Sequence, residues 1–269
     1  MIRSGGSPHH APVYAGSEAK SQAKARRTWG MVNMRRKPSA VLFDFFNTIV
    51  RRVNFDPEMG IRTLLKLAKK PSSISIHEVL VRNTTLEDRL CEVWDTSDVW
   101  STSQQFQRLL FDGLGVNFDA RPDELERCFF EAAMEFERTE GIQRCLSELR
   151  SRGLRLGVVS NHNCTGESLR SALSHLEIAD PFEFVVSSAD YGIGKPHPLI
   201  FETAVAKLGV ESSTTWFVGD NLENDIAGAN EAGLFSVWYN PDENESGRIE
   251  PNATIRSWEE FEELIETVG

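Results

Sequence analysis

From residue 139 to the end of the chain, short apolar runs alternate with segments of helical spacing. The runs hold four to six mostly apolar residues, which predicts buried strands. The segments between them repeat an apolar residue every three or four positions, which predicts helices. The predicted strands are 154–159, 182–187, 215–218 and 234–239, and the predicted helices are 141–150, 168–176, 198–208, 222–232 and a last one that Ser257 caps. Strands that alternate with helices indicate a parallel sheet covered on both faces.

An earlier apolar run, 39–43, predicts a first strand that ends in Asp44. The region after it lacks strand runs and shows helical spacing instead. Helices are predicted to begin at Pro57 and after Ser75, and to cover 105–114 and 123–136. We therefore expect an α/β core formed by 38–52 and 139–269, interrupted by a helical insertion of residues 53–138.

The composition fits a globular protein with a large core. Of the 269 residues, 40% are hydrophobic and 26% charged, and 16 Phe and 6 Trp supply bulky core side chains. No stretch of ~18 uninterrupted apolar residues exists, so we expect no transmembrane helix and no membrane partner. The formal net charge of −11 argues against broad binding to nucleic acid.

The charge is divided unevenly along the chain. Residues 1–37 hold eight basic residues and one acid, a charge of +7, so that the rest, with 21 basic and 39 acidic residues, carries −18. The first 37 residues show almost no periodic apolar pattern and are predicted to be a disordered basic tail. A transit peptide, or a true start at Met31 or Met34, are alternatives for this segment.

The four cysteines are Cys91, Cys128, Cys145 and Cys164. No two of them have the spacing of metal ligands, and no secretory signal is evident. They are predicted to be reduced thiols, which favours a cytoplasmic location.

Polar residues follow the predicted strands at the points where the strands end. Ligands of open parallel sheets bind outside the carboxyl ends of the strands, so these side chains should converge on one crevice. They are Asp44-Phe45-Phe46-Asn47-Thr48, Ser160-Asn161, Gly194-Lys195-Pro196, and Gly219-Asp220 followed by Asp225.

The charges of this group indicate its chemistry. Three carboxylates, from Asp44, Asp220 and Asp225, outnumber Lys195, leaving −2. A phosphate dianion would be repelled by roughly 3 kcal/mol for each unit-charge contact at ~5 Å. A divalent cation removes that charge, and all-oxygen ligands favour Mg²⁺. The hydroxyl of Ser160 and the backbone N–H groups of 45–48 suit phosphoryl oxygens, and a carboxylate in line with phosphorus is a nucleophile.

These motifs resemble those of the haloacid dehalogenase-like (HAD) superfamily over about 39–240. The resemblance implies a Rossmann-like, doubly wound core under a helical type-1 cap, as in subfamily I. It implies Asp44 as nucleophile and a Mg²⁺ ion held by Asp44, Asp220 and the backbone carbonyl of Phe46. Asp225 would orient Lys195 or a metal-bound water. The implied substrate-binding residues are Ser160, Asn161, Lys195 and Thr48.

One position departs from the phosphatases of this family. Most of them carry a second aspartate, a general acid–base, two residues after the nucleophile, where this chain has Phe46. Such a group is typically worth ~10²–10⁴ in rate. The first hypothesis remains a Mg²⁺-dependent phosphatase of a small phosphorylated metabolite, acting as monomer or homodimer through an aspartyl-phosphate.

Phe46 also leaves other hypotheses open. Dehalogenases of the family lack the second aspartate, usually carry an aromatic residue there, and need no metal; Asp44 would then attack carbon. Phosphonate-cleaving members use a cap lysine, for which Lys66, Lys69 and Lys70 are candidates. A weakly active or non-catalytic member would bind a phosphorylated ligand or a protein partner.

Six further residues allow both a functional and a structural interpretation. His162 and His197 suit proton transfer, or loop contacts and helix capping. Arg51 and Arg52 suit a substrate carboxylate or distal phosphate, or an exposed pair. Trp94 and Trp100 suit a substrate pocket, or packing within the helical insertion.

Overall fold

A computed structural model describes residues 37–69, 74–96 and 101–268, with the side chains of 91–96 left out. The basic segment 1–36, Lys70 and Trp100 lie outside these residues. The side chains of Cys91 and Trp94 are likewise not described, so the predictions for all of them stay as predictions.

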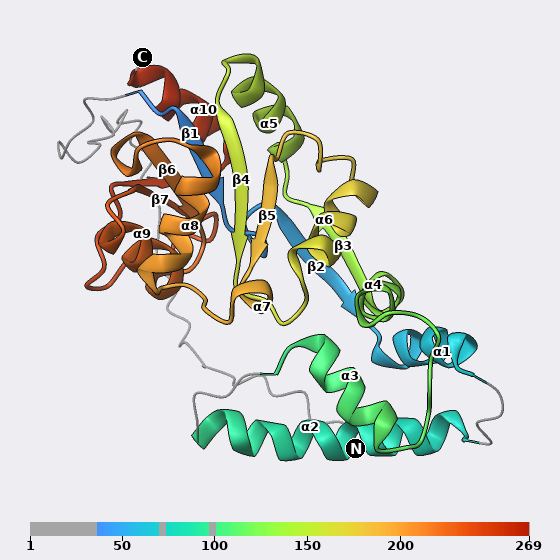
Figure 1. The fold of residues 1–269 in the computed structure, drawn as a ribbon. Coiled ribbons are helices and arrows are strands. Elements are labelled where there is room, and N and C mark those ends of the chain that lie inside the picture. The colour runs from blue at the N-terminus through green and yellow to red at the C-terminus, as the bar shows by residue number, and fades with distance from the viewer. Residues whose placement is uncertain (1–36, 70–73, 97–100, 269) are drawn as a thin grey trace, which may run out of the picture.

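Within the described ranges, six strands form one parallel sheet in the order β5-β4-β1-β6-β7-β8 (Figure 1). The strands are β1 (Ala40–Phe43), β4 (Arg155–Ser160), β5 (Phe184–Ser187), β6 (Thr215–Gly219), β7 (Phe235–Tyr239) and β8 (Ala253–Ile255). The centre of the sheet is β1, in which Phe43 lies beside Val158 of β4 and Val218 of β6. The predicted parallel sheet is confirmed. The edge strand β8 was not predicted, because a run of three residues is too short to show a strand pattern.

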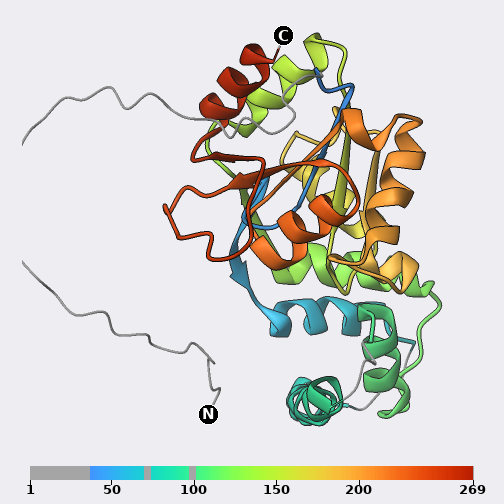
Figure 2. The same ribbon diagram turned by 90° about the vertical axis from the view of Figure 1, so that its left-hand side faces the viewer.

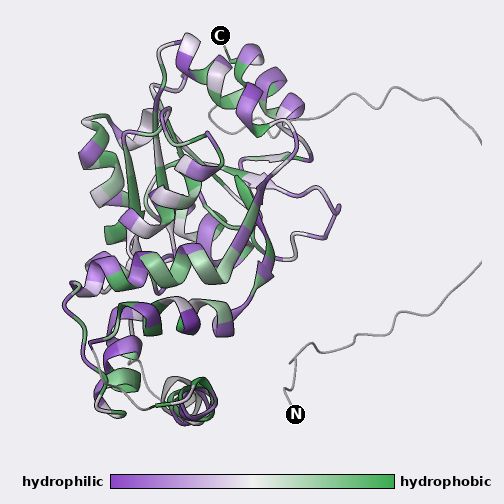
Figure 3. Cartoon of the chain, turned by 90° about the vertical axis from the view of Figure 1, so that its right-hand side faces the viewer, coloured by the Kyte–Doolittle hydropathy of each residue, from purple (hydrophilic) through white to green (hydrophobic). Residues whose placement is uncertain are grey.

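Helices cover both faces of the sheet, which confirms the doubly wound architecture. Side chains of α5 (Ile142–Ser151), α6 (Gly166–His175) and α10 (Trp258–Thr267) pack with Phe43 and Val158 in one core. Those of α8 (Pro198–Leu208) and α9 (Gly228–Glu231) pack with Leu42 and Val159 in another. Successive strand residues therefore face opposite layers. In Figure 3 the strands are largely green, whereas the helices carry both green and purple.

Two short helical turns and one unusual turn complete the core. A short helix α7 (Ser188–Tyr191) follows β5, and a 3₁₀ turn (Ser212–Thr214) precedes β6. The predicted helix over 222–232 is instead a π-helical turn, Leu222–Ala227, followed by α9. This turn begins two residues after Asp220, with Asn221 as its N-cap, and carries Asp225 inward, where it is buried. Such turns are frequent at functional sites.

The insertion contains α1 (Pro57–Leu67), α2 (Ile76–Thr96), α3 (Ser103–Asp112) and α4 (Pro122–Ala133). Pro57 opens α1 after its N-cap Asp56, and the hydroxyl of Ser75 accepts from Glu78 N before α2, both as predicted. Apolar side chains from all four helices, among them Leu64, Val79 and Leu110, form a core of their own. Figures 1 and 2 show α1, α2 and α3 beyond the carboxyl ends of the sheet strands, with α4 beside α6.

A two-stranded ribbon joins this insertion to the sheet, contrary to the strand-free prediction. β2 (Val50–Phe55) pairs antiparallel with β3 (Met134–Arg138). The helix predicted over 123–136 therefore ends at Ala133. Met134–Arg138 alternates apolar and charged residues, which is the period of a strand rather than of a helix. Its backbone N–H and C=O groups form hydrogen bonds with β2 instead of continuing the helix. No helix in the described part of the chain has the length and apolarity to cross a bilayer.

Candidate active site

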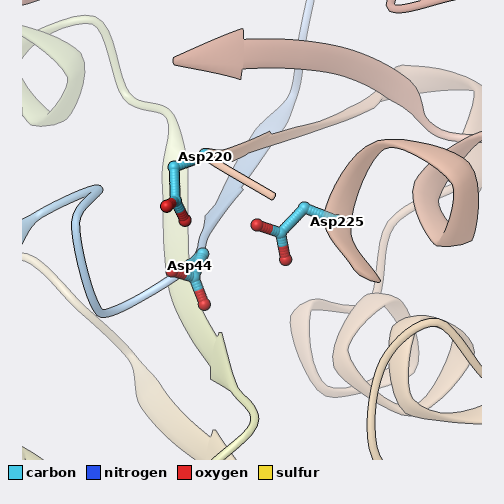
Figure 4. Close-up of side chains that lie close together, drawn as sticks. All are labelled: Asp44, Asp220 and Asp225. Atoms are coloured by element: carbon cyan, nitrogen blue, oxygen red, sulfur yellow. The ribbon is translucent and has the colours of Figure 1, made fainter. Parts of the chain in front are cut away.

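Asp44 emerges from the centre of the sheet, between the ends of β4 and β6. Its backbone N–H donates to Val218 O at 2.8 Å, and the residue is 7% exposed. The neighbouring strands deliver Ser160 and, just past β6, Asp220 at the same edge. Figure 4 shows the carboxyl groups of Asp44, Asp220 and Asp225 gathered at one point. The predicted convergence of the strand ends thus holds for these residues.

Lys195 bridges two of these carboxylates. Its Nζ lies 2.5 Å from Asp44 Oδ1 and 2.7 Å from Asp225 Oδ1, and all three side chains are buried or nearly so. Burial alone would lower the pKa of Lys195, but the charges of Asp225 and Asp44 raise it above its ordinary value. Asp225 is held in turn by Asn221 N, which donates to Oδ2 at 3.0 Å. Lys195 is therefore a fixed cation beside Asp44.

The side-chain amide of Asn161 places Lys195. Lys195 N donates to Asn161 Oδ1 at 2.7 Å, and Asn161 Nδ2 donates to Lys195 O at 2.6 Å. Gly194 and Gly219 permit this close approach, because a Cβ at the first would overlap Asn161 Oδ1 and at the second Asp225 Oδ2. The glycines of both motifs thus make room for the side chains that hold the cation.

The carboxylates outnumber the cation, and the pKa values of Asp44 and Asp220 are raised by burial and by nearby negative charge. One carboxylate oxygen from each of Asp44, Asp220 and Asp225 lies within 4.8 Å of the others. Burial, together with the charge of Asp225, raises the pKa of Asp44 to about 7 despite Lys195. Burial and Asp225 likewise raise the pKa of Asp220 to about 6, although Asn47 donates to it. An all-oxygen site with uncompensated negative charge fits a hard divalent cation such as Mg²⁺.

Two hydroxyls of the predicted site differ in their surroundings. Thr48 Oγ1 donates to Asp44 Oδ2 at 3.3 Å, and Thr48 is fully buried, so its hydroxyl orients the carboxylate. Ser160 Oγ is also buried but has no hydrogen-bond partner among the described residues. A buried hydroxyl without a partner costs free energy that a ligand oxygen would recover.

Phe46 stands in an aromatic cluster beside Asp44. Its ring centroid lies 5.2 Å from that of His162, 5.7 Å from Phe136 and 4.9 Å from Phe45. The Nδ1 atom of His162 accepts from Cys164 N at 2.9 Å. Burial, with the charge of Arg52, lowers the pKa of His162 to about 4. The contact with Cys164 N is a loop contact of the kind predicted for His162, and the lowered pKa disfavours a charged imidazole at pH 7.

Four other candidates have the surroundings of structural or surface residues. His197 caps α8 by accepting from Leu199 N at 3.3 Å. The guanidinium of Arg51 pairs with Glu137 across the ribbon. Lys69 lies 2.5 Å from Asp119, and Lys66 is exposed on α1. These surroundings favour the structural interpretation of the four residues.

The buried carboxylate of Glu126 was not identified from the sequence. Glu126 of α4 is fully buried, and its Oε1 accepts from Thr165 N at 2.8 Å, Thr165 Oγ1 at 2.6 Å and Ser168 Oγ at 2.7 Å. These donors form the N-terminus of α6, which favours a negative charge. Glu126 lies in an amphipathic helix, where glutamates are usually exposed, so the sequence around it does not indicate that it is buried. It ties the insertion to the segment that follows Ser160.

Comparisons with known proteins agree with this arrangement. A family model described as haloacid dehalogenase-like hydrolase matches residues 38–233. Glyceraldehyde 3-phosphate phosphatase of Pyrococcus abyssi is 37% identical over 99 residues, 37% of this chain and 41% of that protein. Pyrimidine 5'-nucleotidase YjjG of Escherichia coli is 29% identical over 167 residues, 61% of this chain and 73% of that protein.

A solved structure shares the fold over most of its length. The HAD phosphatase from Thermococcus onnurineus superimposes with a TM-score of 0.57 and 26% identity, covering 84% of this chain and 97% of that one. The similarity to the Pyrococcus phosphatase, in contrast, spans less than half of that relative.

Proposed function

The chain belongs to the haloacid dehalogenase-like hydrolases, and we propose that it is a Mg²⁺-dependent phosphatase of a small phosphorylated metabolite. The observation that carries the proposal is the excess of carboxylates at the strand ends. Asp44, Asp220 and Asp225 lie together with only Lys195 to balance them, so a phosphate could bind only with a further cation.

The metal ligands are proposed from the resemblance to the family. Asp44 and Asp220, with the backbone carbonyl of Phe46, would hold Mg²⁺, while Asp225 would keep Lys195 beside Asp44. When bound, the ion supplies positive charge that draws in the phosphate and stabilises the charge that develops on it. One relative is named a phosphatase, another a nucleotidase and one solved neighbour a phosphatase, which supports the proposed reaction on phosphate esters.

The chain's own residues account for the chemistry. An oxygen of Asp44, oriented by Thr48, attacks phosphorus, and the bond between phosphorus and the ester oxygen breaks. Lys195 and Ser160 hold the phosphoryl oxygens, and Asn161 keeps Lys195 in place. Water then attacks the phosphorus of phospho-Asp44, which releases phosphate and the free carboxylate. The leaving oxygen takes its proton from solvent, because Phe46 has none to give.

The insertion suits the role of a cap. Its helices lie beyond the carboxyl ends of the strands, have their own apolar core and join the sheet through the β2·β3 ribbon. We propose that residues 53–138 form a type-1 cap over a core of 38–52 and 139–269. Free thiols at Cys128, Cys145 and Cys164 fit the proposed cytoplasmic location.

A metabolite phosphatase screen with and without Mg²⁺ tests the proposal. We expect turnover of p-nitrophenyl phosphate and of selected metabolites, its loss in EDTA, and its loss in Asp44→Asn. Asp112→Asn, which changes an exposed carboxylate of α3, is the matched control. Activity that persists in excess EDTA would overturn the metal-dependent mechanism. Equal inactivity of wild type and Asp44→Asn on a broad panel would favour a protein that only binds phosphorylated ligands.

A second candidate is a 2-haloacid dehalogenase, which the aromatic residue at position 46 favours. In that reaction an oxygen of Asp44 attacks carbon and halide leaves. Asp220 argues against it, because a third carboxylate has no role without a cation. Halide release from 2-chloropropionate in EDTA, with no phosphatase activity, would establish the dehalogenase instead.

A further inference from the structure

The segments after β1 and β4 run side by side next to the carboxylates. Because the strands are parallel neighbours, Asp44 and Ser160 emerge side by side. Two residues further along each segment come Phe46 and His162, whose rings lie 5.2 Å apart and are tilted by 30°. A phosphate bound at Asp44 and Ser160 would therefore have this ring pair two residues along both flanking segments.

Arg52 stands on the face of the β2·β3 ribbon that carries the same aromatic cluster. In the antiparallel register Arg52 lies opposite Phe136, and opposed residues share one face of a ribbon. The ring of Phe136 lies 5.7 Å from that of Phe46. Arg51, one residue earlier, belongs to the other face, where it pairs with Glu137.

The guanidinium of Arg52 is exposed and has no carboxylate partner in the part of the chain that the structure describes. The position of Arg52 on the ribbon face of Phe136 distinguishes it, since other arginines such as Arg108 and Arg248 also have no carboxylate partner among the described residues. The planar guanidinium of Arg52 can donate two parallel hydrogen bonds to a carboxylate or a phosphate.

His162 contributes a hydrogen-bond donor to the same place. Nδ1 accepts from Cys164 N at 2.9 Å, which leaves Nε2 as the ring nitrogen that carries a proton. No described residue accepts a hydrogen bond from Nε2. The ring of Phe46 therefore offers an apolar surface, and the ring of His162 offers a free hydrogen-bond donor. Arg52 adds a positive charge from the same side of the ribbon.

We propose that Arg52 and the Nε2–H of His162 form a second anion subsite, which selects phosphomonoesters whose leaving group carries another anionic group. That group is a carboxylate or a second phosphate, and the ring of Phe46 contacts the carbon chain between the two anions. This inference rests on the proposed phosphatase function and specifies its substrate class.

Matched substrate pairs test the subsite. The pair 3-phosphoglycerate and glycerol 3-phosphate differs by a carboxylate, and the pair fructose 1,6-bisphosphate and fructose 6-phosphate by a phosphate. We expect wild-type kcat/KM to be about tenfold or more higher for the doubly anionic member of at least one pair. Arg52→Gln should lower that ratio about 10- to 100-fold, mainly through KM. The pair that responds identifies the second anion.

Two further variants sharpen the test. Arg52→Lys should restore part of the ratio, since it keeps the charge but not the fork. Arg51→Gln, on the opposite ribbon face, should keep the wild-type ratio. Equal kcat/KM within both pairs, or a ratio that Arg52→Gln leaves unchanged, overturns the subsite.

Binding separates this inference from the proposed function. If no phosphomonoester is turned over, the phosphatase proposal fails. The subsite is then tested by calorimetry, which measures the affinities for 3-phosphoglycerate and glycerol 3-phosphate in the presence of Mg²⁺. Tighter binding of 3-phosphoglycerate that Arg52→Gln abolishes supports it. Equal or absent binding of the two compounds overturns it.

Discussion

The ring of Phe46 lies 5.2 Å from the imidazole of His162, with 30° between their planes. Neither group supplies a proton to a leaving alkoxide at neutral pH. Phe46 has no ionisable proton, and His162, whose pKa is lowered to about 4 by burial and Arg52, is already neutral. For the proposed phosphatase, the rate of the first step should therefore depend strongly on the leaving group.

Restoring a carboxyl group at position 46 tests this dependence. Phe46→Asp should raise kcat for alkyl phosphates about tenfold or more relative to p-nitrophenyl phosphate, because a general acid is worth ~10²–10⁴. Steady-state kinetics on glycerol 3-phosphate and p-nitrophenyl phosphate measure the change. Phe46→Leu is the control, since it also removes the ring contacts but adds no acid. No gain beyond that of Phe46→Leu would mean that a proton donor already acts elsewhere.

The strand-end residues were predictable because burial leaves a simple pattern. A central parallel strand is apolar on both faces, so a run such as 39–43 ending in Asp44 marks both the strand and the point where it meets solvent. Gly219 and Asp220 mark the end of β6 in the same way. The positions of Asp44, Ser160 and Asp220 at one edge followed from topology, whereas Lys195 and Asp225 lie further along the segments after β5 and β6.

Features set by tertiary contact were not predictable. β2 reads Val-Arg-Arg-Val-Asn-Phe, with one buried residue, so neither alternation nor an apolar run identifies it. The buried carboxylate of Glu126 depends on Thr165 and Ser168, about 40 residues later in the chain. The difference between Arg51 and Arg52 depends on which face of the ribbon each occupies.

Removing the buried cation should destabilise the metal-free protein. In Lys195→Met, Asp44 and Asp225 lose their partner, and breaking a buried ion pair in this way costs about 3–5 kcal/mol. Urea unfolding in EDTA measures the free energy of unfolding. Lys66→Met, at an exposed position of α1, is the control and should change it by less than about 0.5 kcal/mol. The double variant Lys195→Met/Asp225→Asn should regain part of the loss, and a further loss there would contradict the pairing.

The raised pKa of Asp44 predicts a pH dependence of stability in EDTA. Its pKa is about 7 in the folded protein, against an ordinary value of 3.8, so the folded state binds the proton more tightly. Its contribution to stability is full below pH 3.8 and is lost as the pH rises toward 7. The free energy of unfolding of wild type should therefore fall relative to Asp44→Asn between pH 4 and 7. Saturating Mg²⁺ should reverse the trend, because the ion binds the ionised carboxylates. A wild-type curve parallel to that of Asp44→Asn would contradict the shift.

Glu126 should contribute more to stability than its neighbour Glu131, although both lie on α4 and accept from α6. Glu126 is fully buried and accepts three hydrogen bonds from Thr165 and Ser168, whereas Glu131 is exposed and accepts one from Ser171. In Glu126→Ala three donors lose their acceptor, and we expect a loss of about 2–4 kcal/mol in the free energy of unfolding, against less than about 1 kcal/mol for Glu131→Ala. Chemical denaturation measures both values, and hydrogen exchange at the amide of Thr165 should accelerate only in Glu126→Ala. Equal losses in the two variants would show that the buried carboxylate does not hold the insertion to α6.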